Sequence, residues 1–186
     1  MARDNQPCFA SPSVAVTEAV GERIGAELGA GCLISLVGEL GSGKTALVRG
    51  LALGLGIHQP VGSPSFTLMN EYEGRVPLYH FDAWMRGREA ALLGEGAGEF
   101  LDGVGVAAVE WGDRVAQFLP TPHLELCLWH RGPTERRLAV RVIGAASGGD
   151  RTRQGRLESA CRSVAGTPGL RPTPFDDASP PEEQSP

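Results

Sequence analysis

Apolar residues in the first third of the chain switch between helical spacing and short continuous runs. Apolar positions at i, i+4 and i+8 predict a helix over residues 17–29, with Thr17 as its N-cap. The continuous apolar run Cys32–Val37 is typical of a buried parallel strand. A glycine-rich loop follows this run, and a second helix is predicted over Ala46–Leu55.

The middle of the chain predicts further strands. Ser65–Tyr72 and Leu78–Phe81 have strand-like composition, and Asp82 directly follows the second of them. Another buried apolar run, GVAAVEW, covers residues 105–111, and a short helix is expected over residues 88–93. Strands that alternate with helices favour an α/β fold.

Two later stretches place leucine or valine at every second residue. They cover residues 124–128 and 138–142, and Gly132-Pro133 supplies a turn between them. This pattern predicts an antiparallel hairpin. We therefore expect one α/β domain with a mostly parallel sheet, flanked by helices and closed by this C-terminal hairpin.

The two ends of the chain differ from its body. Residues 1–12 look flexible, and residues 147–186 hold 5 Gly, 6 Pro and 5 Ser with only four large apolar residues. Such a segment buries too little apolar surface to offset its ordering entropy, so we expect a disordered tail after a folded domain at residues 13–146. An arginine-rich helix over residues 151–164 is the alternative.

Charge and cysteine usage limit the classes of function. The 186 residues contain 17 Lys+Arg and 22 Asp+Glu, for a formal net charge of −5. This balance argues against a broad basic surface for nucleic acid. The four cysteines are widely spaced, and neither a secretory signal nor an apolar run of about 18 residues is visible. We expect a cytoplasmic protein that makes no use of a membrane.

A phosphate-binding motif lies between the first predicted strand and the second helix. Residues 38–45, GELGSGKT, fit the P-loop pattern G-x-x-x-x-G-K-[ST]. Its glycines let backbone N–H groups converge on phosphate oxygens, and the following helix adds its N-terminal partial charge. Lys44 is the only lysine beside 16 arginines, and it should reach the β- and γ-phosphates while Thr45 binds Mg²⁺. The motif predicts nucleotide binding.

Two carboxylates lie at the ends of buried strands. Asp82 ends LYHFD and has the form of a Walker B acid, and Glu110 ends GVAAVE. Because strand carboxyl ends surround the ligand crevice of an open parallel sheet, both are candidates for Mg²⁺ binding or activation of water. Trp111 is a candidate nucleotide cover or a core residue. The Ser63–Phe66 turn occupies the place where other P-loop enzymes sense the γ-phosphate.

Taken together, four motifs resemble the TsaE (YjeE) family of bacterial P-loop ATPases. The motifs are GELGSGKT, SPSF, YHFDAW, and VEW followed by L-P-x-P, and they occur in order between Ser13 and Ile143. The resemblance implies a single P-loop ATPase domain that works with TsaD and TsaB subunits in making N6-threonylcarbamoyladenosine (t6A) at tRNA position 37. tRNA is then engaged indirectly, through the complex. ATP and Mg²⁺ are the implied cofactors.

The resemblance also implies roles for individual residues. Catalytic roles fall to Lys44, Asp82 and Glu110, and metal binding falls to Thr45 and Glu110. The implied ATP-binding residues are Gly41, Ser42, Gly43, Lys44, Thr45, Ala46, Thr17, Trp111 and Arg136. Arg137 remains an alternative to Arg136.

The sequence departs from the family pattern at three positions. Ser65 replaces a usual Thr, Met85 a usual Arg, and Gly112 a usual Pro. Two other functions stay open on the residues alone. They are a small-molecule or nucleoside kinase, and a nucleotide-gated binding module with negligible turnover.

Overall fold

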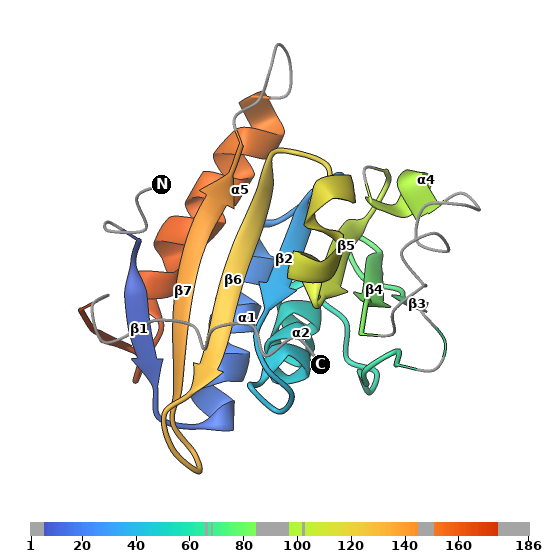
Figure 1. Cartoon of the computed structure of the whole chain (residues 1–186). Coiled ribbons are helices and arrows are strands. Elements are labelled where there is room, and N and C mark those ends of the chain that lie inside the picture. The colour runs from blue at the N-terminus through green and yellow to red at the C-terminus, as the bar shows by residue number, and fades with distance from the viewer. Residues whose placement is uncertain are drawn as a thin grey trace.

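The computed structural model describes residues 6–65, 67, 69–84, 97–101, 103–144 and 151–174. In chain order the elements are β1 (Cys8–Ser11), α1 (Val14–Glu27), β2 (Leu33–Val37), α2 (Lys44–Gly54), β3 (Met69–Tyr72), β4 (Leu78–Asp82), α4 (Ala97–Leu101), β5 (Val106–Glu110), η1 (Gly112–Phe118), β6 (His123–His130), β7 (Arg136–Ile143), α5 (Arg151–Ser163), η2 (Val164–Gly166) and β8 (Arg171–Pro172). The strands form one eight-stranded sheet in the order β3-β4-β5-β2-β6-β7-β1-β8. Helices lie on both of its faces (Figure 1).

The sheet is mixed, which corrects the expectation of a mostly parallel one. Strands β4, β5, β2 and β6 run parallel to their neighbours within that group. Strands β3, β7, β1 and β8 all pair antiparallel. The β6–β7 hairpin is confirmed, but it does not close the domain, because β1 pairs with the free edge of β7 and β8 pairs with β1.

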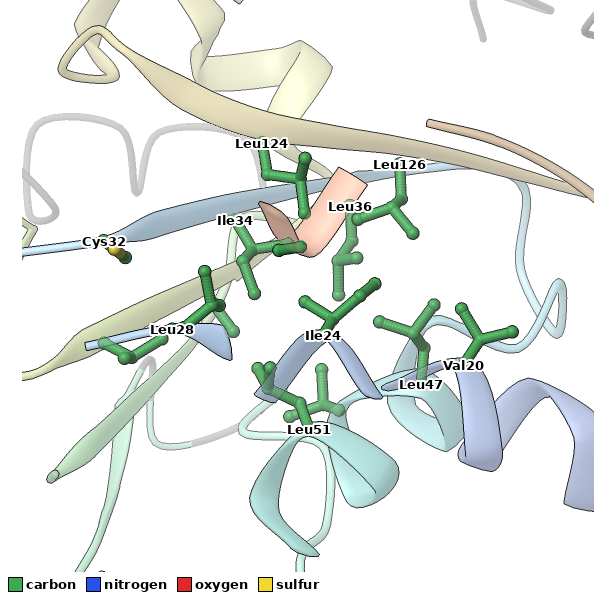
Figure 2. Packing of buried hydrophobic residues seen from close by; sticks show 14 of the residues in the cluster. Val20, Ile24, Leu28, Cys32, Ile34, Leu36, Leu47, Leu51, Leu124 and Leu126 are labelled. Carbon is green, nitrogen blue, oxygen red and sulfur yellow. The ribbon is translucent and has the colours of Figure 1, made fainter. Parts of the chain in front are cut away.

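The main core lies between the sheet and helices α1, α2 and α5. Alternate residues of every central strand point toward these helices, as the period of two requires. Figure 2 shows Ile34 and Leu36 of β2 facing Ile24 of α1 and Leu51 of α2, with Leu126 of β6 beside them. All five side chains are fully buried. This packing fixes α2, and with it the loop that precedes it, against the carboxyl end of β2.

Helices α1 and α2 touch through glycines. A Cβ added at Gly50 would lie 1.8 Å from the carbonyl oxygen of Glu18, and one at Gly21 would lie 2.1 Å from that of Leu47. Glycine usually weakens a helix interior. Here it is required, because any larger residue would force the two backbones apart.

The opposite face of the sheet carries a smaller core. Leu101 of α4 and Val115 of η1 pack there against β4 and β5 residues that include Phe81 and Val109. Within the described residues, no helix has the length and apolar character needed to cross a membrane.

Most predicted elements are confirmed, with shifted ends. Helix α1 begins earlier than expected, because the Ser13 hydroxyl, and not that of Thr17, caps it by accepting from the Val16 N–H at 3.3 Å. Thr17 lies one turn inside the helix and is buried. Helix α2 begins at Lys44, two residues before the predicted Ala46. The helix expected over residues 88–93 lies outside the described residues.

The expectation of disordered ends is wrong for the parts that the structure describes. The first 12 residues supply β1, and residues 151–174 form α5, η2 and β8. Leu157, Ala160 and Val164 recur at i, i+3 and i+7 and are fully buried, with α5 packed on α1 and β7. The helix is the alternative expected over residues 151–164, and these three apolar residues join the main core. Residues 147–150 and 175–186 of the expected tail lie outside the described residues.

Candidate functional site

The loop between β2 and α2 is shaped by glycines. Gly38 has φ +148°, and a Cβ there would lie 2.1 Å from the Leu128 carbonyl oxygen of β6. Gly43, at φ +105°, is the N-cap of α2 and provides no side chain to cap the helix. The first backbone N–H groups of α2 therefore have no side-chain acceptor at the N-cap position. A helix start of this form favours binding of an anion.

Lys44, the first residue of α2, folds back over this loop. Its Nζ donates to the carbonyl oxygens of Gly38 at 2.6 Å and Glu39 at 2.9 Å. The same ammonium lies 3.6 Å from the centroid of the Trp111 ring, a cation–π contact. Burial lowers the pKa of Lys44 to about 8, although the Glu110 carboxylate and other nearby acids oppose the shift. The desolvated charge is therefore poised to gain from an added anion.

The two carboxylates predicted from strand ends do meet. In the parallel β4–β5 pair, Asp82 is in register with Glu110. Both share the strand face of Leu78, which points toward α1 and α2, because positions two residues apart point the same way. Both are 4% exposed. The register thus sets two buried carboxylates side by side, below the start of α2.

Glu110 is bound from two sides through one oxygen. Its Oε1 accepts from the Thr45 hydroxyl at 2.8 Å and lies 2.9 Å from Nε2 of His80. The Thr45–Glu110 contact joins α2 to β5. It supplies two hard oxygen donors of the kind that Mg²⁺ prefers, so these residues fit the magnesium site that the motif implies.

Asp82 is held by the loop that precedes β3. Its Oδ2 accepts from the hydroxyls of Ser63 at 2.9 Å and Ser65 at 2.8 Å, and its Oδ1 accepts from the Trp84 N–H at 2.8 Å. The Tyr72 hydroxyl in turn holds Gly62 of the same loop, accepting from its N–H at 3.3 Å. Loop 62–65 therefore makes direct contact with the second carboxylate. Phe66, the last residue of the predicted Ser63–Phe66 turn, lies outside the described residues.

Two tryptophans and an arginine border the site. The rings of Trp84 and Trp111 lie 4.4 Å apart, and the Arg114 guanidinium stacks 4.5 Å and 4.9 Å from them. Trp111 has φ +61°, a left-handed backbone conformation that residues other than glycine rarely adopt. Gly112 follows it, and a Cβ there would lie 2.1 Å from Oγ of Ser35. A larger residue at position 112 would therefore require the Ser35 hydroxyl to move.

Arg136, rather than Arg137, lies beside the glycine-rich loop. Its guanidinium donates to the carbonyl oxygen of Gly41 at 3.4 Å. Arg137 points to the other face of the sheet and donates to the carbonyl oxygen of Pro174. Strand parity separates the two, because neighbours along β7 must face opposite ways.

The structure thus gathers the predicted residues around one loop. Thr17 also lies close, since a Cβ at Gly43 would be 3.8 Å from its methyl group. Its hydroxyl, however, is buried and lies 2.8 Å from that of Ser11. Ser42 is fully buried within the loop, and Ala46 is nearly so.

Sequence reasoning missed two residues that touch the site. His80 binds Glu110, and Arg114 stacks on both tryptophans. A signal existed for His80, because a polar residue two positions before Asp82 in a buried strand must share its face. For Arg114 there was none, since its contacts depend on the course of η1.

The fold and site together define a class. The protein is a single α/β domain in which a glycine-rich strand–loop–helix unit lies beside two buried carboxylates. The family model described as "Threonylcarbamoyl adenosine biosynthesis protein TsaE" matches residues 11–138. The chain belongs to the TsaE family.

Individual relatives agree with this assignment. A "tRNA threonylcarbamoyladenosine biosynthesis protein TsaE" from Treponema pallidum is 45% identical over 100 residues, covering 54% of this chain and 74% of the relative. The protein of the same name from Bacillus subtilis is 36% identical over 129 residues, covering 69% and 80%. The crystal structure of B. subtilis YdiB superposes with a TM-score of 0.68 at 29% identity, covering 89% of this chain and 97% of that one.

Proposed function

We propose that the protein is a Mg²⁺-dependent P-loop ATPase of the cytoplasm. It hydrolyses ATP to ADP and phosphate, slowly when alone, and so supports repeated turnover of a TsaD–TsaB complex that forms t6A37 on tRNA. One observation carries the ATPase proposal: Thr45 donates to Glu110, Asp82 is in register with Glu110, and both carboxylates act on the Lys44 ammonium at the start of α2.

Each of these groups has a task in the proposed reaction. The loop N–H groups and the Lys44 ammonium bind the phosphates, and Arg136 lies at the rim of the loop. Thr45 and Glu110 would hold Mg²⁺, whose charge neutralises phosphate oxygens when it is bound. Asp82 orients the attacking water and accepts its proton while the water oxygen bonds to the γ-phosphorus. The bond from that phosphorus to the bridging oxygen breaks, and ADP leaves.

Loop 62–65 gives the site a way to report its state. Ser63 and Ser65 donate to the same oxygen of Asp82, so a movement of Asp82 on loss of the γ-phosphate would change the hydrogen bonds of this loop. A partner docked on the loop would sense hydrolysis. This arrangement suits an ATPase that acts on another protein.

The partners and the tRNA rest on the family. The relatives are named for tRNA threonylcarbamoyladenosine biosynthesis. The net charge of −5 supports contact with tRNA through the complex rather than over a broad surface of this chain.

The test is reconstitution of t6A synthesis from purified components with an unmodified tRNA. We expect several t6A per TsaD–TsaB complex with the wild-type protein, and no repeated synthesis with Asp82→Ala or Glu110→Ala, although both variants still dock. Glu73→Ala, which removes an exposed carboxylate from the β3–β4 turn, is the matched control and should support full turnover. Multiple turnover without the protein, or with both site variants, would contradict the proposal.

The same assay separates the alternative functions. Isotope-labelled ATP is supplied with nucleosides or sugars, and then with the TsaD–TsaB complex. Stoichiometric phosphorylation of a small molecule would indicate a kinase. Nucleotide-dependent docking without any release of phosphate would indicate a binding module.

A further inference from the structure

A histidine is buried inside the catalytic strand pair. His80 is fully buried in β4, between two apolar residues that face the opposite core. It shares the face of Asp82, and nothing in the proposed reaction uses it. Burial of an imidazole costs free energy unless its nitrogens form hydrogen bonds. The hydrogen bond between His80 and Glu110 is therefore the feature that indicates what this residue does.

That hydrogen bond defines the chemical form of the ring. The Glu110 carboxylate can only accept, so Nε2 of His80 carries the proton that it donates to Oε1 at 2.9 Å. Nδ1 is buried and has no hydrogen-bond partner in the described part of the chain. A proton on Nδ1 would be a buried donor without an acceptor, which the fold would have to offset. The geometry therefore identifies Nε2 as the nitrogen that donates to Glu110.

We propose that His80 is a positioning residue for Glu110. Together with the Thr45 hydroxyl, 2.8 Å from the same oxygen, it fixes the carboxylate in one orientation beside the first turn of α2. A carboxylate held by two donors loses less freedom when it binds a cation, so its affinity for the cation rises. The inference rests on the proposed function in one respect, because it takes Thr45 and Glu110 as the Mg²⁺ ligands.

Two substitutions at His80 separate its hydrogen bond from its bulk. His80→Leu keeps an apolar side chain of similar size and removes the donor. His80→Gln retains an amide N–H that can reach Glu110. Tyr79→Leu is the matched control, since Tyr79 is buried in the same strand but packs against Phe100 on the other face.

The measurement is binding of Mn²⁺, followed by electron paramagnetic resonance, with a non-hydrolysable ATP analogue present. We expect His80→Leu to weaken Mn²⁺ binding about tenfold, the lower end of the usual effect of an outer-shell partner. His80→Gln should recover most of the affinity, and Tyr79→Leu should leave it unchanged. Affinity for the analogue without metal should be the same in all four proteins. Unchanged Mn²⁺ affinity in His80→Leu, or equal loss in Leu and Gln, would overturn the proposal.

A second measurement uses the unmodified protein. Long-range proton–nitrogen correlation spectra of metal-free protein should show the His80 ring as the Nε2–H tautomer, and an Nδ1–H tautomer would overturn the assignment. The two failures are distinguishable. If wild-type protein with the analogue binds no Mn²⁺, the proposed metal site fails. If wild-type binds Mn²⁺ and His80→Leu binds it equally well, only the role of His80 fails.

Discussion

The β4–β5 end of the molecule and the α5 region bury different kinds of side chain. Under the start of α2, Lys44, Asp82 and Glu110 are each 4% exposed, and every one of them is charged or can be. Where α5 covers α1 and β7, the buried residues are Leu157 and Ala160, both apolar. Burial in the first region changes the properties of ionisable side chains, whereas burial in the second stabilises the fold.

This contrast has an energetic consequence. A buried charge costs free energy unless it is paired, and the lowered pKa of Lys44 shows that its partners do not fully offset its desolvation. Apolar burial at about 25 cal/mol per Å² works in the opposite direction. Substitutions in the two regions should therefore have different effects. Those at the site should lower activity, and those under α5 should lower stability.

The largest expected effect is on turnover. Lys44→Ala should lower ATP hydrolysis by at least about 100-fold, because the phosphates lose a fixed cation in a dry site. Lys44→Arg should fail as well, since a planar guanidinium does not fit within the loop. Thermal unfolding should show only a small change in the stability of Lys44→Ala, because removal of a desolvated charge offsets the loss of its contacts with Gly38, Glu39 and Trp111.

Arg49→Ala is the matched control for this comparison. Arg49 is a half-exposed cation on the same helix, paired with Glu18 at 2.8 Å, and surface pairs contribute at most about 1 kcal/mol. Its turnover should equal that of the wild-type protein. Full hydrolysis by Lys44→Ala would show that the loop is not the phosphate site.

The next effect is on stability and lies under α5. Leu157→Ala should lower the free energy of unfolding by about 3 kcal/mol, because it opens a cavity at a fully buried position. ATP affinity of the folded protein should not change. Urea unfolding checks the first statement, and Arg162→Ala on the exposed face of α5 should stay within about 0.5 kcal/mol of wild type. A Leu157→Ala protein as stable as wild type would mean that α5 adds nothing to the fold.

The sequence predicted the site better than it predicted the α5 region. The order strand, GELGSGKT and helix, and the acids at the ends of LYHFD and GVAAVE, depend on local patterns that a single chain displays. The register that brings Asp82 and Glu110 together follows from parallel pairing of neighbouring strands. The motif and the strand ends needed only local information, whereas the pairing of β4 with β5 is a contact that the structure supplies.

The sequence did not predict β1, β8 or the docking of α5, because their signals depend on tertiary contacts. Strand β1 has four residues, and it is a strand because it completes the hydrogen bonds of β7. Helix α5 was expected only as the alternative to a disordered tail, because the segment is polar and arginine-rich and its apolar positions gain partners only by docking on α1 and β7. The expectation of a mostly parallel sheet was wrong partly for the same reason, since β1 and β8 were not predicted and are two of the antiparallel strands.

A third prediction joins the two regions through the α1–α2 contact. Gly50→Ala should lower the free energy of unfolding by about 1–3 kcal/mol, because the new methyl group would meet the Glu18 carbonyl, which is backbone and cannot rotate away. Since α2 begins at Lys44, ATP affinity should also fall.

Gly155→Ala provides the matched control for that prediction. Gly155 lies in α5 with nothing within 4 Å of an added Cβ, so alanine there should stabilise the protein by about 0.5–1 kcal/mol through helix propensity. Chemical unfolding of the two variants side by side gives opposite signs if the glycines of α2 serve packing. Equal effects would leave the glycines of α2 without that role.

The smallest expected effect is the pH dependence of stability from a buried histidine at the start of β6. Burial lowers the pKa of His123, whose Nδ1–H donates to the Pro120 carbonyl at 2.8 Å, and the nearby Glu125 carboxylate and that backbone bond oppose the shift while Arg141 adds to it. Because the folded-state pKa lies below that of the unfolded chain, the unfolded chain binds more protons as pH falls below about 6.5. Stability from this group is therefore complete at neutral pH and is lost as pH falls through the lowered value.

His123→Asn keeps a donor for the Pro120 carbonyl but cannot titrate, so its free energy of unfolding should fall less than that of wild type between about pH 7 and pH 5. Carboxylates common to both proteins cancel in the difference of the two curves, and parallel curves would show that the buried ring does not resist protonation.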